Sequence, residues 1–417
     1  MSKEKLIIKN FGPIKSVDLD LGKITILIGE QASGKSTIAK VLAVCRYFSY
    51  IVNYRVQIDK QNQFHSNVQF AEGLESWGIR NYLKEDSEII YVNHLYKFEF
   101  KYSSEIDQKK IVKVDELVKE NFKLYTRINS ESSQFTELLN QLENLKIDDS
   151  ALLKNNNIET FGYSWTPNEN FYRLNVKKVM DNPLFIPAER GFQSLAVGRD
   201  SLLPDAIIDE LAKINKIVRG YNIDIDIKPL DIVFRNENGL SKIKKAGDKY
   251  FYLLHTGASG YQSTIPVYLA VKFNNDIKIN RGRTIIVEEP ELNLYPKTQK
   301  KIVEFFAESI SEFHNQFILP THSPYILTTL SNLIYAHKVG TAEKGKYEKE
   351  VDNIISKKSW IDVNDLSVYY LNSGKADNMV NREDCIINLD NLDNVSEVIN
   401  KEFDELLNIE NKYSLNE

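Results

Sequence analysis

A glycine-rich loop between a predicted strand and a predicted helix most constrains how this chain of 417 residues can fold. Residues 24–28 (ITILI) have the β-branched composition of a buried strand, and the apolar residues after position 37 recur at helical spacing. Between them, residues 29–36 (GEQASGKS) contain two glycines separated by four residues and end in Lys-Ser. Such a loop surrounds phosphate oxygens with backbone N–H groups at the N-terminus of a helix. The pattern therefore predicts an α/β protein that binds the phosphates of a nucleotide.

The loop residues have separate predicted roles. Lys35 is expected to reach the β- and γ-phosphates, and the Ser36 hydroxyl is expected to hold Mg²⁺. The other residues predicted to bind the nucleotide here are Gly29, Ser33, Gly34 and Thr37. The alternative is a glycine turn that only begins an ordinary helix, and the flanking strand and helix make it the weaker interpretation.

Two carboxylates follow a second predicted strand, residues 284–287 (TIIV). Successive residues of a strand point to opposite sides, so Glu288 and Glu289 can do different work. We assign Glu288 to the Mg²⁺ shell and Glu289 to the general base that activates the attacking water. Acidic residues at a strand end are often only solvated, and the upstream loop is what favours the catalytic interpretation.

A histidine follows the next short apolar run, residues 317–320 (FILP). In a parallel sheet this turn lies at the same edge as the other strand ends, where ligands bind. We therefore expect His322 to contact the γ-phosphate, although a lone histidine in a turn is often without function.

Residues 258–262 (ASGYQ) precede another predicted helix and predict a second anion site, with Ser259, Gly260 and Gln262 as its residues. In isolation the segment would be only a helix N-cap. One chain would then have two anion-binding sites for one phosphate group. Two chains arranged head to tail resolve this, because Ser259 of one chain would then face the nucleotide bound by Lys35 of the other.

Six segments in chain order carry a family resemblance: KNFGPI, GEQASGKST, IPAERG, ASGYQS, VEEPELNLYP and THSPYIL. Together they resemble the ATPase heads of the OLD and SMC-like branch of ABC proteins, which includes RecF-like and anti-phage ATPases. The resemblance covers residues 1–50 and 183–338. The sequence departs from transport ABC proteins at Ala258, where Leu is common, and at Glu288, where Asp is usual. Gln193 is a candidate for the Mg²⁺-sensing glutamine of this superfamily, but an ordinary loop glutamine is the preferred interpretation.

The resemblance implies an ABC-type α/β head with a mixed or parallel sheet and flanking helices. We place its N-terminal part at residues 1–50 and its C-terminal part at 183–338. Between them, residues 51–182 are polar, contain no chemical motif and predict an inserted subdomain with a hairpin and helices. Residues 339–417 form a predicted extension with a strand at 366–372 and a helix near 394–408.

The resemblance also implies an enzyme that binds ATP and Mg²⁺, forms a dimer or higher oligomer around ATP, and separates after hydrolysis. One function left open is the sensor or regulatory subunit of a bacterial anti-phage system that controls a separately encoded effector, such as a nuclease or toxin. The other is a RecF-like DNA clamp for repair or chromosome maintenance. A transporter subunit is disfavoured by the size of the insertion. We do not expect nuclease activity, because the segment after His337 has no convincing Glu followed by a strand with Asp-x-Asp.

Charge and hydropathy narrow the location and the partners. The net charge is −5, from 53 Lys and Arg against 58 Asp and Glu, so DNA binding would need a local patch such as residues 242–245. No apolar run approaches the roughly 18 residues of a membrane span, and no targeting segment is apparent. The two cysteines, Cys45 and Cys385, lie in no metal-binding pattern. These features predict a cytoplasmic protein with reduced thiols and no membrane partner.

Overall fold

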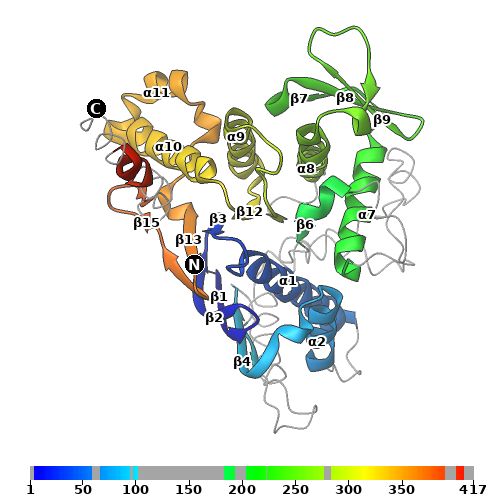
Figure 1. Ribbon diagram of the computed structural model, residues 1–417, viewed down its shortest axis with the longest axis vertical. Helices are drawn as coiled ribbons and strands as arrows, with labels where there is room; N and C mark the ends of the chain where they lie inside the picture. The colour runs from blue at the N-terminus through cyan, green and yellow to red at the C-terminus, as the bar shows by residue number, and fades with distance from the viewer. Residues whose placement is uncertain are drawn as a thin grey trace, which may run out of the picture.

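A ten-stranded mixed sheet organises the computed structural model, which describes residues 4–58, 66–93, 97–101, 183–192, 203–221, 223–276, 283–389 and 401–407 (Figure 1). Its strands are β1 (Glu4–Phe11), β2 (Ile14–Leu21), β3 (Ile24–Gly29), β4 (Leu83–Val92), β5 (Lys97–Lys101), β6 (Leu184–Ile186), β11 (Thr284–Val287), β12 (Gln316–Thr321), β13 (Leu366–Asn372) and β14 (Lys375–Asn378). Their order across the sheet is β5-β4-β1-β2-β14-β13-β3-β12-β11-β6. The predicted α/β class with a mixed sheet is confirmed.

Two smaller sheets accompany the large one. A four-stranded antiparallel sheet consists of β7 (Ile225–Ile227), β8 (Ile232–Glu237), β9 (Leu240–Lys245) and β10 (Tyr252–Leu253), and a two-stranded sheet pairs β15 (Val380–Asn381) with β16 (Ile386–Ile387). The helices are α1 (Lys35–Ile58), α2 (Ser66–Ser76), α7 (Asp205–Gly220), α8 (Ser259–Asp276), α9 (Pro296–Phe313), α10 (Pro324–Thr341) and α11 (Glu348–Ile354).

Five neighbouring strands of the large sheet, β13, β3, β12, β11 and β6, run parallel to one another. Their carboxyl ends therefore share one edge of the sheet. The loops that follow β3, β11 and β12 are three of the four segments that the sequence predicts to carry the chemistry, and the fourth, residues 258–262, lies at the start of α8. The topology thus gathers these loops at the edge where open α/β sheets bind ligands.

Both faces of the parallel strands are covered by apolar packing. Ile26 and Ile285 enter a cluster that includes residues of α8, α9 and α10, whereas Leu27 and Ile286 enter a cluster that includes residues of α1. Figure 1 shows α1 and α2 on one side of these strands and α8, α9 and α10 on the other. Alternate side chains of a strand point to opposite faces, so strands covered on both sides must be apolar throughout. This explains the continuous apolar runs in the sequence.

Strands from the predicted insertion and from the predicted C-terminal extension complete the large sheet. The predicted hairpin is present as β4 and β5, and β4 pairs with β1. The predicted strand at 366–372 is β13, which lies between β14 and β3. The domain boundaries themselves stay predictions. Residues 102–182, with the helices predicted there, lie outside the described residues, and 401–407 is the described helical part of the predicted terminal helix.

Among the described residues, no helix has the length and apolar character needed to cross a bilayer.

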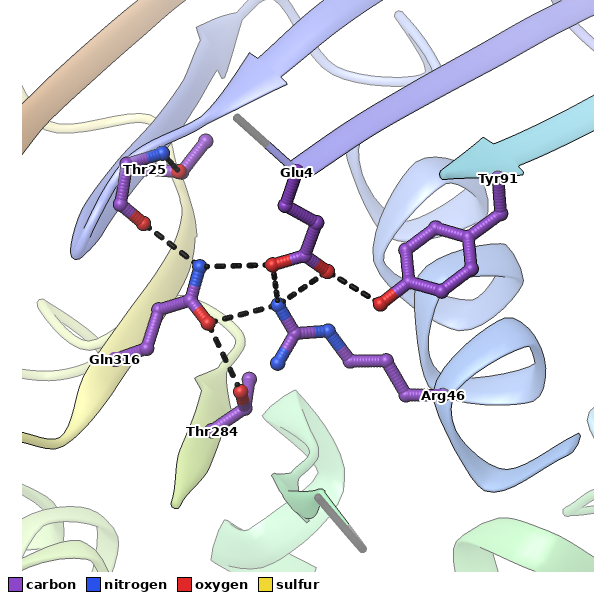
Figure 2. Close-up of polar contacts among 7 residues, drawn as sticks. Glu4, Thr25, Arg46, Tyr91, Thr284 and Gln316 are labelled. Carbon is purple, nitrogen blue, oxygen red and sulfur yellow. Dashed lines mark hydrogen bonds and ion pairs between the residues drawn. The ribbon is translucent and has the colours of Figure 1, made fainter. Parts of the chain in front are cut away.

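A polar cluster lies at the amino ends of β11 and β12, at the edge opposite the predicted site (Figure 2). Arg46 of α1 donates through Nη2 to both carboxylate oxygens of Glu4, at 2.6 and 2.5 Å, and to Oε1 of Gln316 at 2.8 Å. Tyr91 donates its hydroxyl to Glu4, and Thr284 donates to Gln316 Oε1 at 3.1 Å. The cluster therefore ties β1, β4, β11, β12 and α1 together. Only 3% of the Arg46 side chain is exposed, so these partners, rather than water, stabilise its charge.

Replacing Arg46 by methionine should destabilise the fold strongly. The change leaves the Glu4 carboxylate, whose side chain is 17% exposed, without its cation. Removing one partner of a buried ion pair costs about 3–5 kcal/mol, and urea denaturation would measure the loss.

The matched control is Lys358→Met, which removes an ion pair with Glu312 whose side chains are 67% and 42% exposed. An exposed pair contributes less than about 1 kcal/mol. Equal losses in the two variants would contradict the role assigned to the Arg46 cluster.

Candidate functional site

The predicted phosphate loop connects β3 directly to α1. Its backbone turns at Gly34, where φ is 103°, a conformation that side chains other than glycine rarely adopt. A Cβ atom at this position would lie 2.3 Å from Cδ1 of Ile14. The start of β2 therefore packs against the loop, and only glycine fits between them.

Lys35, the first residue of α1, points into the loop. Its Nζ donates to the carbonyl oxygens of Gly29 at 2.8 Å and Glu30 at 2.7 Å, and to Oγ of Ser33 at 3.3 Å. Burial lowers the pKa of Lys35 to about 8, against the opposing effect of nearby carboxylates, chiefly Glu289. The ammonium group therefore lies in the centre of the loop, where the sequence predicts phosphate binding.

Glu288 lies at the end of β11 beside the loop and is 3% exposed. Burial raises the pKa of its carboxyl group to about 7, while the charge of Lys40 and a hydrogen bond with Ser36 act in the opposite direction. Oε2 accepts a bond from the backbone N–H of Ala188 at 3.4 Å, and Oε1 has no hydrogen-bond partner among the described residues. The hydroxyl and the carboxylate predicted to hold Mg²⁺ are therefore close enough to influence each other.

Glu289 turns away from the strand in a left-handed conformation, with φ of 44°. Its Oε1 lies 3.9 Å from Nε2 of His322, and the two side chains are 38% and 39% exposed. The backbone N–H of His322 donates to Oε1 of Glu291 at 2.7 Å. The predicted general base and the predicted γ-phosphate contact are thus neighbours at the open edge, and Glu291 fixes the turn that carries the histidine.

Arg190 is a central residue of the site that the sequence analysis did not single out, although it lies in the segment IPAERG. It is 1% exposed. Its Nη1 donates to the carbonyl oxygens of Glu288 at 2.6 Å and Pro187 at 3.0 Å, its Nη2 to that of Glu289 at 2.6 Å, and its Nε to that of Ser263 at 3.0 Å. Burial lowers the pKa of its guanidinium to about 10, so it remains charged at neutral pH. The signal for this role in the sequence is an arginine four residues after the end of a short apolar strand.

The second predicted anion site begins at Ser259, an exposed residue at the start of α8. A Cβ on Gly260 would lie 2.7 Å from the carbonyl oxygen of Asn293, so this glycine allows close contact with the segment after β11. Gln262 donates through Nε2 to the carbonyl oxygen of Gly257 at 2.9 Å and so closes its own turn. The nucleotide contacts of Ser259, Gly260 and Gln262 stay predictions.

The structure brings Lys35, Glu288, Glu289 and His322 to one edge of the sheet. Gln193 lies outside the described residues. Within the described ranges, no three His, Cys, Asp or Glu side chains form a metal site by themselves. Mg²⁺ is commonly bound by one or two carboxylates together with substrate phosphates, so the pairing of Ser36 with Glu288 fits a magnesium ion that arrives with a nucleotide.

A pocket of about 380 Å³ adjoins the phosphate loop on the side of β13. Its lining comes from the start of β2 and the turn before it, from the loop, and from the end of β13 and the turn after it: Pro13, Lys15, Glu30, Gln31, Ala32, Ser33, Leu371, Asn372, Ser373 and Gly374. The volume lies within the range of roughly 300–1,000 Å³ that is usual for small-molecule sites.

A glycine loop between a central parallel strand and a helix, with carboxylates at the end of a nearby strand, defines a P-loop nucleotide-binding protein. Residues 24–328 match the family described as "AAA domain, putative AbiEii toxin, Type IV TA system". The match covers well over half of the chain, and the protein belongs to this family of ATPase domains. Membership implies nucleotide binding, typically with Mg²⁺, and ATP hydrolysis. No curated protein matches the sequence.

Similar solved structures include the SMC head domain from Thermotoga maritima, at 13% identity and a TM-score of 0.36, which covers 79% of this chain and 92% of that chain. Another is the Smc head domain with an extended coiled coil bound to the C-terminal domain of ScpA, derived from Pyrococcus furiosus, at 13% identity, a TM-score of 0.32, and 90% and 94% coverage. A third is a dimeric post-hydrolysis ATP-binding cassette bound to ADP and Pi, at 12% identity, a TM-score of 0.28, and 89% and 96% coverage.

Glu291→Ala should lower kcat for ATP by about 10- to 100-fold, because a hydrogen bond to a charged group is worth about 1.5–3 kcal/mol and this one holds the His322 turn. Glu291→Gln keeps an acceptor oxygen and should retain most of the activity. Steady-state ATPase assays would measure both. Equal losses in the two variants would show that the charge of Glu291, rather than its bond to the turn, is what matters.

Proposed function

We propose that the protein is an ATP-hydrolysing switch in which two chains enclose ATP between the P-loop of one and the Ser259 turn of the other. The observation that carries the proposal is the meeting of Lys35, Glu288, Glu289 and His322 at one edge of the sheet, brought there by three elements: α1, the segment after β11 and the turn after β12. Belonging to a family of ATPase domains supports the choice of ATP.

The chemistry assigned to each residue follows from its surroundings. Lys35 binds the β- and γ-phosphate oxygens in place of the loop carbonyls that its Nζ contacts. Ser36 and the buried Glu288 would hold Mg²⁺, which neutralises developing charge on the phosphates. Glu289 is solvent-accessible, as a residue that orients and deprotonates the attacking water must be. His322, beside it, donates to the γ-phosphate.

The two-chain arrangement is proposed because Ser259 is exposed at the N-terminus of an α-helix of 18 residues. The unpaired N–H groups and the dipole of a helix N-terminus favour an anion. The same chain already has a phosphate loop, so the anion for Ser259 is the nucleotide of a second copy. The pocket beside the P-loop is the place proposed for the nucleoside.

Glu289→Gln should trap an ATP-bound dimer. Loss of the base lowers kcat by about 100-fold or more while ATP binding persists, so dimers accumulate. Size-exclusion chromatography with light scattering, with and without ATP and Mg²⁺, would detect them. Adding Ser259→Arg to this variant should abolish the dimer but leave ATP binding by the monomer within about threefold, a change of less than about 1 kcal/mol.

Lys35→Ala serves as the control that removes ATP binding, and it should give no dimer under any condition. A Glu289→Gln protein that hydrolysed ATP at the normal rate would refute the assigned base. A dimer that survived Ser259→Arg would refute the head-to-tail arrangement.

We further propose that the switch controls a separate effector protein in a bacterial defence system. The family description links the matching domain to a putative toxin of a type IV toxin–antitoxin system, which supports a role in such a system, whereas the separate effector is a proposal from the sequence resemblance. The alternative is a DNA clamp, for which Lys242 and Lys244 on β9 are candidates. Lys242 forms an ion pair with Glu237 at 2.5 Å, which offsets its charge, whereas Lys244 lies 5.0 Å from the ring centre of Phe251 and keeps its full charge.

DNA affinity separates these two functions. For an effector-controlling switch we expect weak DNA binding that does not change with ATP, measured by fluorescence anisotropy of labelled duplex DNA between about 50 and 200 mM salt. Binding that appears only with ATP and falls steeply with salt would favour the clamp. Purification of the Glu289→Gln chain from cells that carry its neighbouring genes should recover the effector in an ATP-dependent manner.

A further inference from the structure

Arg190 joins two parts of the molecule that the proposed function keeps chemically separate. We propose that Arg190 is a positioning residue that holds the catalytic segment, residues 288–294, and the start of α8 together as one rigid body within each chain. The proposal rests on the proposed function, because the segment carries the assigned base and α8 carries the turn assigned to the partner's nucleotide.

The guanidinium contacts three segments at once. Its donors bind carbonyl oxygens of the catalytic segment (Glu288 and Glu289), of α8 (Ser263) and of the turn after β6 (Pro187), at 2.6–3.0 Å. A guanidinium presents five N–H donors in a fixed planar arrangement, so these bonds define both distance and direction. At 1% exposure the charge is removed from water, and carbonyl oxygens are its hydrogen-bond partners.

Two further contacts join the same parts. Ser263, which is fully buried, donates through Oγ to the carbonyl oxygen of Leu292 at 2.8 Å. Gly260 lies so close to Asn293 that an added Cβ would be 2.7 Å from its carbonyl oxygen. The first turns of α8 therefore contact the catalytic segment at several points, and Arg190 adds a further link by binding carbonyl oxygens of both.

The backbone of the assigned base depends on this contact. Glu289 has φ of 44°, which residues other than glycine, asparagine and aspartate adopt at a cost. Its N–H donates to the carbonyl oxygen of Pro320 at 2.8 Å, and its own carbonyl oxygen accepts from Arg190. Bonds on both sides of the residue thus hold the conformation that directs its carboxylate toward His322.

In a head-to-tail pair this link connects the two nucleotides. The start of α8 meets the nucleotide bound by the partner, whereas Glu289 acts on the nucleotide bound by its own chain. Because the connection between them is rigid, contact of α8 with the partner's nucleotide also positions Glu289 for hydrolysis of the nucleotide bound by its own chain. Arg190 would therefore make hydrolysis at the two sites cooperative.

Arg190→Lys and Arg190→Gln test the proposal in the full chain. Lysine keeps the charge but has one donor nitrogen in place of a planar group with three, and glutamine loses the charge. We expect the ATP affinity of both variants to stay within about threefold of the wild-type value. The kcat should fall by at least about tenfold in the glutamine variant and by less in the lysine variant. The Hill coefficient for ATP should fall towards 1 in both variants.

Hydrogen–deuterium exchange provides a readout that needs no hydrolysis. Backbone amides in residues 259–264 and 288–294 should exchange faster together in Arg190→Lys, with little change elsewhere in the described residues. Arg235→Lys is the matched control, because Arg235 is an exposed arginine paired with Asp224 at 2.5 Å on the small antiparallel sheet. It should change neither the exchange of these segments nor the ATPase kinetics.

Several outcomes would overturn the role of Arg190. Unchanged kcat and Hill coefficient in both variants would do so, as would faster exchange in only one of the two segments. A loss of ATP affinity and a lower urea midpoint that parallel the loss of kcat would also do so, because they indicate a general structural role. A wild-type chain without ATPase activity would refute the proposed function instead, and the exchange experiment would still decide whether Arg190 links the two segments.

Discussion

The parallel register of β3, β12 and β11 is the constraint on which the site depends. Ile26 of β3 pairs with Leu319 of β12, and Ile286 of β11 pairs with Ile318 of β12. These pairs fix how far each strand extends towards the carboxyl edge of the sheet. They therefore also fix the position of the loop that follows each strand. A shift of one residue would reverse the faces of a strand whose side chains are packed on both sides, so the register is strongly specified. The geometry of the site is therefore set by apolar packing some distance from it.

Buried charged side chains lie at both ends of this apolar sheet, and their hydrogen-bond partners differ between the two ends. At the amino end, the Arg46 charge is matched by a carboxylate and an amide, and the cluster is closed by side chains (Figure 2). At the carboxyl end, the buried cations Lys35 and Arg190 bind mainly carbonyl oxygens, and the carboxylate of Glu288 keeps an oxygen without a partner among the described residues. The first arrangement suits stability. The second leaves capacity for phosphates and a divalent cation.

The sequence predicted the parts of the site that local patterns determine. A glycine loop, acidic residues after an apolar run and a histidine after the next run are each contained within a few residues, and parallel strands are enough to bring them to one edge. Arg190 could not be assigned in this way, because its partners Ser263 and Glu288 are 73 and 98 positions away along the chain. Strand pairing was hidden for the same reason. Nothing near Ile89 indicates that it lies opposite Ile8, which is why a segment predicted to be an insertion includes strands of the main sheet.

The place of β13 has a consequence for how the chain folds as it is synthesised. Strand β3, which leads into the phosphate loop, lies between β12 and β13, and both neighbours are encoded far downstream. Until residue 372 has left the ribosome, one side of β3 lacks its hydrogen-bonding partner. Long-range pairings of this kind form slowly, and an unpaired apolar strand is prone to aggregation. The nucleotide loop, although encoded near the start of the message, is therefore among the last features to be completed, because β3 gains both neighbours only after β12 and β13 have been made.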